Sequence, residues 1–399
     1  MNHNKTLLKE RMKNSLKMIL FISVLILIFF ISTSLFSLEI INSNSLNNEI
    51  MLGEGTKENP YRITNWYELN NVRNYKGSHF ILENNLDYKT DGYKEIAGEN
   101  ANDGKGWLPI GNINLAIFEI AEDIPEEELE EIVKKEFFVG VFNGNNNYIK
   151  GLKINREEEN GVAIGLFGAV IYSEIKNLNL IEIDIKGKYS VGGLVGLLLE
   201  SSLKNSYSNG KVKGFGFVGG VVGGVDESVI TSSYSDCNVE GIEFVGGLAG
   251  KIQNNSTTEK SYSTGNVEGI EFVGGFAGGN LENSSISNSY STSNVESYGF
   301  AGGFVGVNAE KSTITNSYSA GNVQCNQNFG GFVGGNYSYS TIKNCYYDKE
   351  KSKQNDFSAI PKTSFRMKQQ KTYENWDFEK VWIINEGISY PRLRKSNYY

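Results

Sequence analysis

The chain has 399 residues, a formal net charge of −8 and an isoelectric point of about 5.2. An acidic chain without a basic stripe lacks the cations that displace counterions from phosphates, so a nucleic-acid partner is disfavoured. The 45 glycines would suit a disordered chain, but 22 Phe and 22 Tyr recur periodically, which favours a packed one. Three cysteines (Cys237, Cys325 and Cys345) and two histidines give no disulfide framework and no ligand spacing, so we expect neither metal nor cofactor.

Residues 1–37 are interpreted as an export segment. Lys and Arg dominate residues 1–17, and an uncharged apolar run follows from Met18 to Phe36. Such a run just spans a bilayer, so a cleaved signal peptide and a retained signal anchor both stay open. Either arrangement puts the rest of the chain outside the cytoplasm, with membrane contact only through residues 18–36. Residues 38–52 are interpreted as a linker.

Residues 53–160 predict an N-terminal cap and the first irregular coils of a repeat array. Tyr61–Ile63 and His79–Leu82 predict strands, and between them Asn65 predicts the cap of a short helix. Further strand-and-turn segments follow at 106–112 and 137–155. A cap of this kind covers the core and the strand edges that the end of an array would otherwise expose.

An acidic insertion occupies residues 117–136. Pro125 suits the first position of a helix and Lys134-Lys135 suit its last turn, so the segment predicts a helix. A solvated helical insertion is favoured over a cation or partner site.

Residues 161–347 repeat one phrase with a nearly fixed period. The tyrosine of the Asn-Ser-Tyr-Ser phrase, or its equivalent, recurs in steps of 27, 28, 28, 28 and 28 residues, at Tyr207, Tyr234, Tyr262, Tyr290, Tyr318 and Tyr346. A pair of glycines recurs with the same rhythm, at 192–193, 219–220, 246–247, 274–275, 302–303 and 330–331. A fixed period of this size indicates a stacked array.

Each copy carries three short segments separated by Gly, Asn and Ser, for example Phe300–Val305, Ser312–Ser319 and Gly321–Gln324. Short strands with such corners predict one coil of a parallel β-helix, with coils stacked about 4.8 Å apart. The paired glycines would serve a close approach between coils or a positive φ. Two columns are expected: an internal one of Val212, Val239, Val267, Val295 and Val323, and one near the corner of Phe217, Phe244, Phe272, Phe300 and Phe329.

One corner of the coil accepts insertion. The spacing from Tyr to Val and from Val to the glycine pair is constant, whereas the segment from the glycines to the next Tyr varies from 15 to 16 residues. The residues at this variable corner also differ most between copies, from Leu-Leu-Leu-Glu-Ser-Ser in the first to Gly-Asn-Tyr-Ser-Tyr-Ser in the last. Loops stacked on one edge of a solenoid are a usual place for a binding surface, with neutral drift as the alternative.

Two other columns are candidates. Glu240, Glu268 and Glu296, with Glu243 and Glu271 three residues on, form an acidic column, for which a solvated outer face is favoured over a calcium-bearing one. The tyrosine column is open to two interpretations, a sugar-stacking ladder or a covered structural ladder.

Residues 348–399 predict a C-terminal cap. A short helix begins near Thr363, and large aromatic residues follow at Trp376, Phe378, Trp382 and Tyr390. They predict a lid over the last coil.

The phrases V-G-G-L-V-G, V-G-G-L-A-G and V-G-G-F-A-G, each followed by S-Y-S, resemble the GLUG-motif repeats of bacterial surface and secreted proteins. The flanking G-T-K-E-N-P-Y-R-I, W-L-P-I-G and closing Y-P-R-L phrases extend the resemblance over residues 53–394. It implies an all-β, right-handed parallel β-helix outside the cytoplasm. Some relatives add a zinc peptidase domain, but this chain has only His3 and His79 and no H-E-x-x-H, so that activity does not carry over.

The favoured function is a non-catalytic surface or secreted protein, adhesin-like or a spacer, that binds a glycan or a host or matrix protein at the variable corner. The alternative is a polysaccharide lyase or hydrolase, which needs converging acids or acids beside a Lys or Arg base. Ser190–Tyr347 holds no Arg, and its acids recur in register, so we predict no catalytic, cofactor-binding or metal residues.

Overall fold

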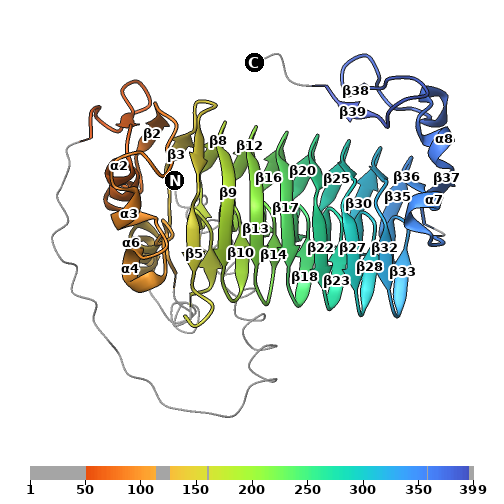
Figure 1. Cartoon of the computed structure of the whole chain (residues 1–399), viewed down its shortest axis with the longest axis horizontal. Helices are drawn as coiled ribbons and strands as arrows, with labels where there is room; N and C mark the ends of the chain where they lie inside the picture. Colours follow the sequence, from red (N-terminus) through yellow and green to blue (C-terminus); the bar gives the residue numbers. More distant parts are fainter. Residues whose placement is uncertain (1–50, 114–125, 160, 357, 395–399) are drawn as a thin grey trace, which may run out of the picture.

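The computed structural model describes residues 51–113, 126–159, 161–356 and 358–394. These residues form a rod of stacked parallel strands with unlike ends (Figure 1). The predicted parallel β-helix is therefore confirmed. The apolar run 18–36 lies outside the described residues, so the export segment and its helix stay a prediction. Among the described helices none is long and apolar enough to cross a membrane.

Four parallel sheets run along the rod, and each coil visits them in the order A, B, D, C. Sheet A comprises β1 (Tyr61–Ile63), β2 (His79–Leu82), β3 (Val141–Asn143), β8 (Glu174–Lys176), β12 (Ser202–Lys204), β16 (Val229–Thr231), β20 (Thr257–Glu259), β25 (Ser285–Ser287), β30 (Thr313–Thr315) and β35 (Thr341–Lys343).

Sheet B is the broad sheet facing the viewer in Figure 1. It comprises β4 (Tyr148–Lys150), β5 (Lys153–Asn155), β9 (Asn179–Lys186), β13 (Tyr207–Lys213), β17 (Tyr234–Glu240), β21 (Tyr262–Thr264), β22 (Asn266–Gly269), β26 (Tyr290–Ser291), β27 (Asn294–Ser297), β31 (Tyr318–Ser319), β32 (Val323–Cys325), β36 (Tyr346–Asp348) and β37 (Ile360–Lys362).

Sheets D and C flank the glycine pair. Sheet D comprises β6 (Ala163–Ile164), β10 (Ser190–Gly192), β14 (Val218–Gly219), β18 (Glu243–Gly246), β23 (Glu271–Gly274), β28 (Phe300–Gly302) and β33 (Asn328–Gly330). Sheet C comprises β7 (Phe167–Ile171), β11 (Val195–Leu199), β15 (Val222–Asp226), β19 (Ala249–Gln253), β24 (Ala277–Asn280), β29 (Val305–Asn308) and β34 (Val333–Asn336). The expected single segment Phe300–Val305 is thus two strands, because the chain turns at the glycines.

The glycine pairs allow backbone segments to approach each other closely. None of the glycines at 192–193, 219–220, 246–247, 274–275 or 302–303 has a positive φ. A Cβ on Gly219 would collide with the carbonyl of Val222, and the same collision recurs at Gly246, Gly274 and Gly302. The third glycine of the phrase lets sheet C lie against sheet D: a Cβ on Gly250 would meet the Val218 amide nitrogen at 2.5 Å. Only a missing side chain permits this backbone contact.

The valine column is internal, as predicted. Val212, Val239, Val267, Val295 and Val323 pair in register and are buried. The prediction of the phenylalanine column is partly wrong. The rings of Phe217, Phe244, Phe272 and Phe300 follow one another with centroids 4.8–5.7 Å apart, the first pair edge to face and the others stacked, but Phe329 pairs with Ala301 and is exposed. These rings form a cluster outside the main core, with Leu281 and Val307. The core column is instead Phe276, Phe304 and Phe332, which directly follow the glycine pairs.

Two buried serine ladders hold the corners of the coils. Along one, the amide of each serine donates to the hydroxyl of the serine in the next coil at 2.9–3.1 Å, from Ser201 through Ser228, Ser256, Ser284 and Ser312 to Ser340. The second runs through Ser206, Ser233, Ser261, Ser289 and Ser317 at 3.1–3.4 Å. Amides at the corners cannot join the sheet ladders, so the serines satisfy groups that would be costly to bury unpaired.

The N-terminal end is covered by short helices: α2 (Trp66–Asn71), η1 (Val72–Asn74), α3 (Tyr93–Ile96) and α4 (Ala101–Gly104). Asn65 caps α2, as predicted, by accepting a hydrogen bond from the Glu68 amide. Buried Trp66 and Trp107 lie edge to face beneath these helices. From the acidic insertion, the structure describes α6 (Glu126–Glu136), whose Val133 packs on an apolar cluster with Leu197 and Leu199 of sheet C.

The C-terminal segment both closes the end and folds back along the side of the rod. It comprises α7 (Lys349–Ser352), α8 (Ser364–Met367), η2 (Gln370–Thr372), β38 (Trp382–Ile383) and β39 (Arg392–Leu393) beside β37. At the end, β37 pairs with β36, and Asp356 accepts hydrogen bonds from the amides of Phe332 and Val333. Trp376 packs on Tyr346 of the last coil, and the two tryptophans also pack on Tyr290 and Tyr318 of earlier coils, so the segment extends beyond the predicted lid.

Removing one whole coil should leave a folded protein. Deleting Phe272–Gly299 joins Glu271 to Phe300, which occupies the same coil position as Phe272. The core columns then stay continuous, and we expect β-type circular dichroism and a cooperative thermal transition. Deleting only Phe272–Ser285 leaves each later column out of register and should abolish the transition. Equal melting of the two variants would contradict the stacking described here.

Candidate ligand-binding edge

The tyrosine ladder is structural. Rings of Tyr234, Tyr262, Tyr290 and Tyr318 follow one another at centroid distances of 4.3, 4.7 and 5.1 Å, with interplanar angles of 24° or less. Their faces therefore contact each other, and a sugar ring would need one of those faces for stacking. Tyr290, Tyr318 and Tyr346 are also buried under the C-terminal aromatic residues. The ladder thus favours the covered structural interpretation.

The acidic column lies on the solvated outer face of sheet B. Glu240, Glu268 and Glu296 pair in register and are exposed, and Lys213 reaches Glu240 at 2.6 Å. Like charges at this spacing are tolerable because water screens them. No three His, Cys, Asp or Glu side chains in the described part of the chain group as a metal site would require.

The variable corner joins sheet C to sheet A, and a change in backbone conformation explains its insertions. In the shorter copies one residue is left-handed, Glu200 with φ 41° or Glu227 with φ 43°. In the longer copies two successive residues are left-handed, for example Glu282-Asn283 and Glu310-Lys311. The inserted residue is absorbed by one extra left-handed step, so the strands on both sides keep their register.

Side chains at this corner differ from coil to coil and point outward. Tyr172 donates a hydrogen bond to Glu200, Asn255 and Lys311 are exposed, and Tyr339 is 91% exposed. We call this row, from Tyr172 to Tyr339, the variable edge. On this surface the chemistry changes at nearly every step, while the strands on both sides keep their register.

A polar cluster that sequence reasoning missed lies on the outer face of sheet C. Lys251 occupies a register column otherwise made of Leu197, Gly224, Gly279 and Val307. Its ammonium lies over the rings of Phe217 and Phe244 at 5.4 and 5.3 Å. The signal was present in the sequence, since Val-Gly-Gly-Leu-Ala-Gly is followed by Lys where the next copy has Gly.

Asp226 is the carboxylate of this cluster. It is 2% exposed and accepts hydrogen bonds from the side-chain amides of Gln253 at 3.4 Å and Asn254 at 3.1 Å. Burial raises the pKa of Asp226 to about 7, while the amide of Asn254 opposes this and Glu227 adds to it. Burial likewise lowers the pKa of Lys251, against the effect of Glu282 and Glu310.

Such perturbed groups often mark functional sites. Here the phenylalanine rings cover the lysine, and the carboxylate lies almost entirely out of solvent. A polysaccharide chain therefore has no open access to Lys251 and Asp226. The cluster is best explained as structural, with Lys251 covered by phenylalanine rings and Asp226 held by the amides of Gln253 and Asn254.

A shallow cleft of about 160 Å³ lies where the N-terminal helices meet sheet B. Lys105, Lys153 and Lys186 line it, together with Glu99 and Asp184. Lys153 pairs with Glu99 and Lys105 pairs with Glu159, both at 2.9 Å. The cleft is small and its charges are largely balanced within the chain.

The fold and the repeat define the class of protein, a parallel β-helix closed by unlike ends. The GLUG motif matches residues 187–213 and 273–296, at the glycine pairs and the strands around them. The chain therefore carries GLUG-motif repeats, in line with the resemblance seen in its sequence.

Two similar proteins extend this comparison. The chain is 37% identical over 131 residues to a protein of Evansella cellulosilytica named "Putative Gly-rich membrane protein". The match takes in 32% of this chain and only 12% of that much longer relative. The structure also resembles that of a protein from Bacteroides ovatus, described as a putative immunoglobulin A1 protease. The TM-score is 0.51 at 17% identity, over 86% of this chain and 95% of that one. At that identity the likeness concerns the fold alone.

Asp226 should make stability depend on pH. Its pKa is about 7 in the folded chain and about 3.9 when unfolded, so the folded state holds the proton more tightly. The resulting stabilisation is complete below about pH 4 and is lost as the pH rises through about 7. Asp226→Asn should remove this contribution to the slope of the free energy of unfolding against pH. It should also raise the free energy of unfolding at pH 8, on the order of 2–4 kcal/mol.

Urea unfolding at pH 5 and pH 8 measures this difference. Asp236→Asn, at an exposed position of the neighbouring β17, is the matched control and should keep the wild-type slope. An unchanged slope in Asp226→Asn would show that the carboxylate is not buried as described.

Proposed function

We propose that this GLUG-repeat β-helix is a non-catalytic surface or secreted protein that works outside the cytoplasm. It binds a glycan or a host or matrix protein along the variable edge, and the rod holds that edge away from its point of attachment. The observation that carries the proposal is the contrast at the corner between sheets C and A. Side chains and length vary there, while the register of both sheets is unchanged. A rigid scaffold under changeable residues is a usual design for recognition.

The location outside the cell rests on the basic and apolar residues 1–36 and on the likeness to a protein named as a membrane protein. The name of the Bacteroides ovatus protein supports no protease activity here, because only the fold is shared. The chain also lacks an H-E-x-x-H phrase.

A polysaccharide lyase or hydrolase is the second candidate. Lys251 with Asp226 is the observation that favours it, since a lysine with a lowered pKa can act as a base beside a carboxylate. The phenylalanine rings over Lys251 and the burial of Asp226 argue against it. Incubation of the full chain with acidic and neutral polysaccharides decides the matter. New reducing ends or unsaturated products that vanish in Lys251→Met would establish turnover and refute the non-catalytic proposal.

Substitutions at the variable edge should weaken binding without unfolding the rod. A screen of glycans and matrix proteins identifies the ligand, and the triple variant Asn283→Gly, Lys311→Gly, Tyr339→Gly then tests the edge. Glycine suits the left-handed conformation of all three residues, so only side chains are lost. We expect affinity to fall about tenfold or more. Lys211→Ser, at an exposed position of sheet B, is the control. Equal affinity of the triple variant and the wild type would place the ligand elsewhere.

A further inference from the structure

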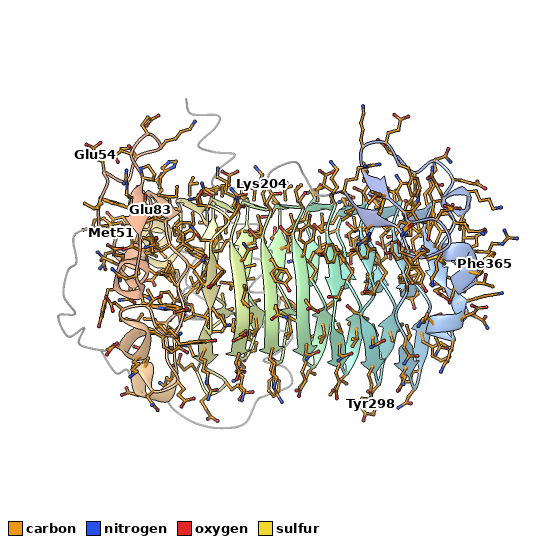
Figure 2. The ribbon with its side chains drawn as sticks, turned by 45° about the horizontal axis from the view of Figure 1, so that its top comes forward. Met51, Glu54, Glu83, Lys204, Tyr298 and Phe365 are labelled. Carbon is orange, nitrogen blue, oxygen red and sulfur yellow. The ribbon has the colours of Figure 1, made fainter. Side chains whose placement is uncertain are left out.

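An exposed apolar ridge follows the turn from sheet B to sheet D through four successive coils. Its members are Phe215, Ile242, Ile270 and Tyr298. Backbone hydrogen bonds stack them: the Ile242 amide donates to Phe215, the Ile270 amide to Ile242, and the Gly299 amide to Ile270. Phe215, Ile270 and Tyr298 are 50%, 48% and 61% exposed. Figure 2 shows Tyr298 projecting from the lower rim of the rod.

The ridge is backed by the stacked rings of Phe217, Phe244, Phe272 and Phe300, two residues further along each coil. Phe244 and Phe272 take φ values of 48° and 53°, which bulky residues rarely adopt. In these two coils the turn is therefore held in an uncommon conformation, with one apolar residue on the ridge and the next in the phenylalanine cluster beside sheet C. Single exposed apolar residues are ordinary, but a contiguous row marks a place of interaction.

Carboxylates border the ridge on both sides. Glu240, Glu268 and Glu296 run along its sheet B side, and Glu243 and Glu271 pair in register on its sheet D side. Residues 237–250 and 261–299 contain no Lys or Arg at all. Lys213 pairs with Glu240 and also acts on Glu268, and Lys251 acts on Glu243 from sheet C. The middle of the ridge, at Ile270, is thus apolar with a border that carries more carboxylates than cations.

We propose that this ridge is a docking surface for a cationic amphipathic polypeptide. The partner would lay an apolar row on Phe215, Ile242, Ile270 and Tyr298, with Lys or Arg on both sides of that row facing the glutamates. Charge complementarity of this kind selects the partner and sets its register. It disfavours anionic lipids and nucleic acids, which the same carboxylates would repel. The ridge and the variable edge lie at different turns of the coil, so the two proposals stand or fall separately.

A synthetic amphipathic peptide with leucines on one helical face and lysines on both sides of them is the probe. Fluorescence anisotropy measures its binding to the full chain, with the same peptide carrying Glu for Lys as the control. We expect saturable binding of the lysine peptide that weakens as salt is raised. The variant Ile270→Ser, Tyr298→Ser should lose about tenfold or more in affinity. Glu268→Gln, Glu271→Gln should lose affinity and flatten the salt dependence.

The control variant Tyr339→Ser, Glu310→Gln changes the same types of residue at the variable edge and should stay within about twofold of the wild type. All four positions of the test variants are exposed, and circular dichroism checks that each variant is folded. Absence of binding, equal binding of the Glu peptide, or equal losses in test and control variants would each overturn the proposal. Stronger binding to neutral phosphatidylcholine vesicles than to the lysine peptide would overturn it in favour of a lipid surface.

Discussion

The rest of the structure depends on the contact between the backbones of sheets C and D. The chain reverses at each glycine pair, and the third glycine then lies against the sheet D strand of the preceding coil, as Gly250 does against Val218 and Gly278 against Val245. No side chain fits between these backbones. The contact fixes how closely sheet C lies against sheet D, whereas the hydrogen bonds along each sheet set the spacing of about 4.8 Å from one coil to the next. The GLUG motif is the sequence that permits this contact.

A rod built this way separates stability from function. Valine and phenylalanine columns fill its interior, serine ladders satisfy its corner amides, and the tyrosine ladder seals one side beneath the C-terminal aromatic residues. Residues that carry specificity are therefore free to change only where the backbone leaves the sheets. Two such places are the variable edge between sheets C and A and the apolar ridge between sheets B and D. A stack of coils turns each of them into a row, which suits extended ligands rather than small molecules.

The period of the sequence was sufficient to predict the stacked coils, the internal valine column, the insertion-tolerant corner and the solvated acidic column. A period alone does not say which side of the backbone a residue takes. Phe244 was expected near the corner, but its left-handed φ sends the ring to the outside of sheet C, where it covers Lys251. For the same reason the ridge went unseen, because Ile270 between Gly and Glu looks like an ordinary strand residue. The burial of Asp226 depends on its neighbours Gln253 and Asn254 in the next coil, which no local spacing encodes.

The most direct test of this account is the free energy of unfolding of Gly250→Ala against Gly216→Ala. A Cβ at Gly250 would meet the Val218 amide nitrogen at 2.5 Å, whereas at Gly216 the nearest atom is 3.4 Å away in ordinary contact. Neither glycine has a positive φ, so the two substitutions differ chiefly in the room available. We expect Gly250→Ala to cost about 1–3 kcal/mol or more, as overpacking does, and Gly216→Ala to change stability little. Equal stability of the two variants would contradict the claim that the glycine contact holds the coils together.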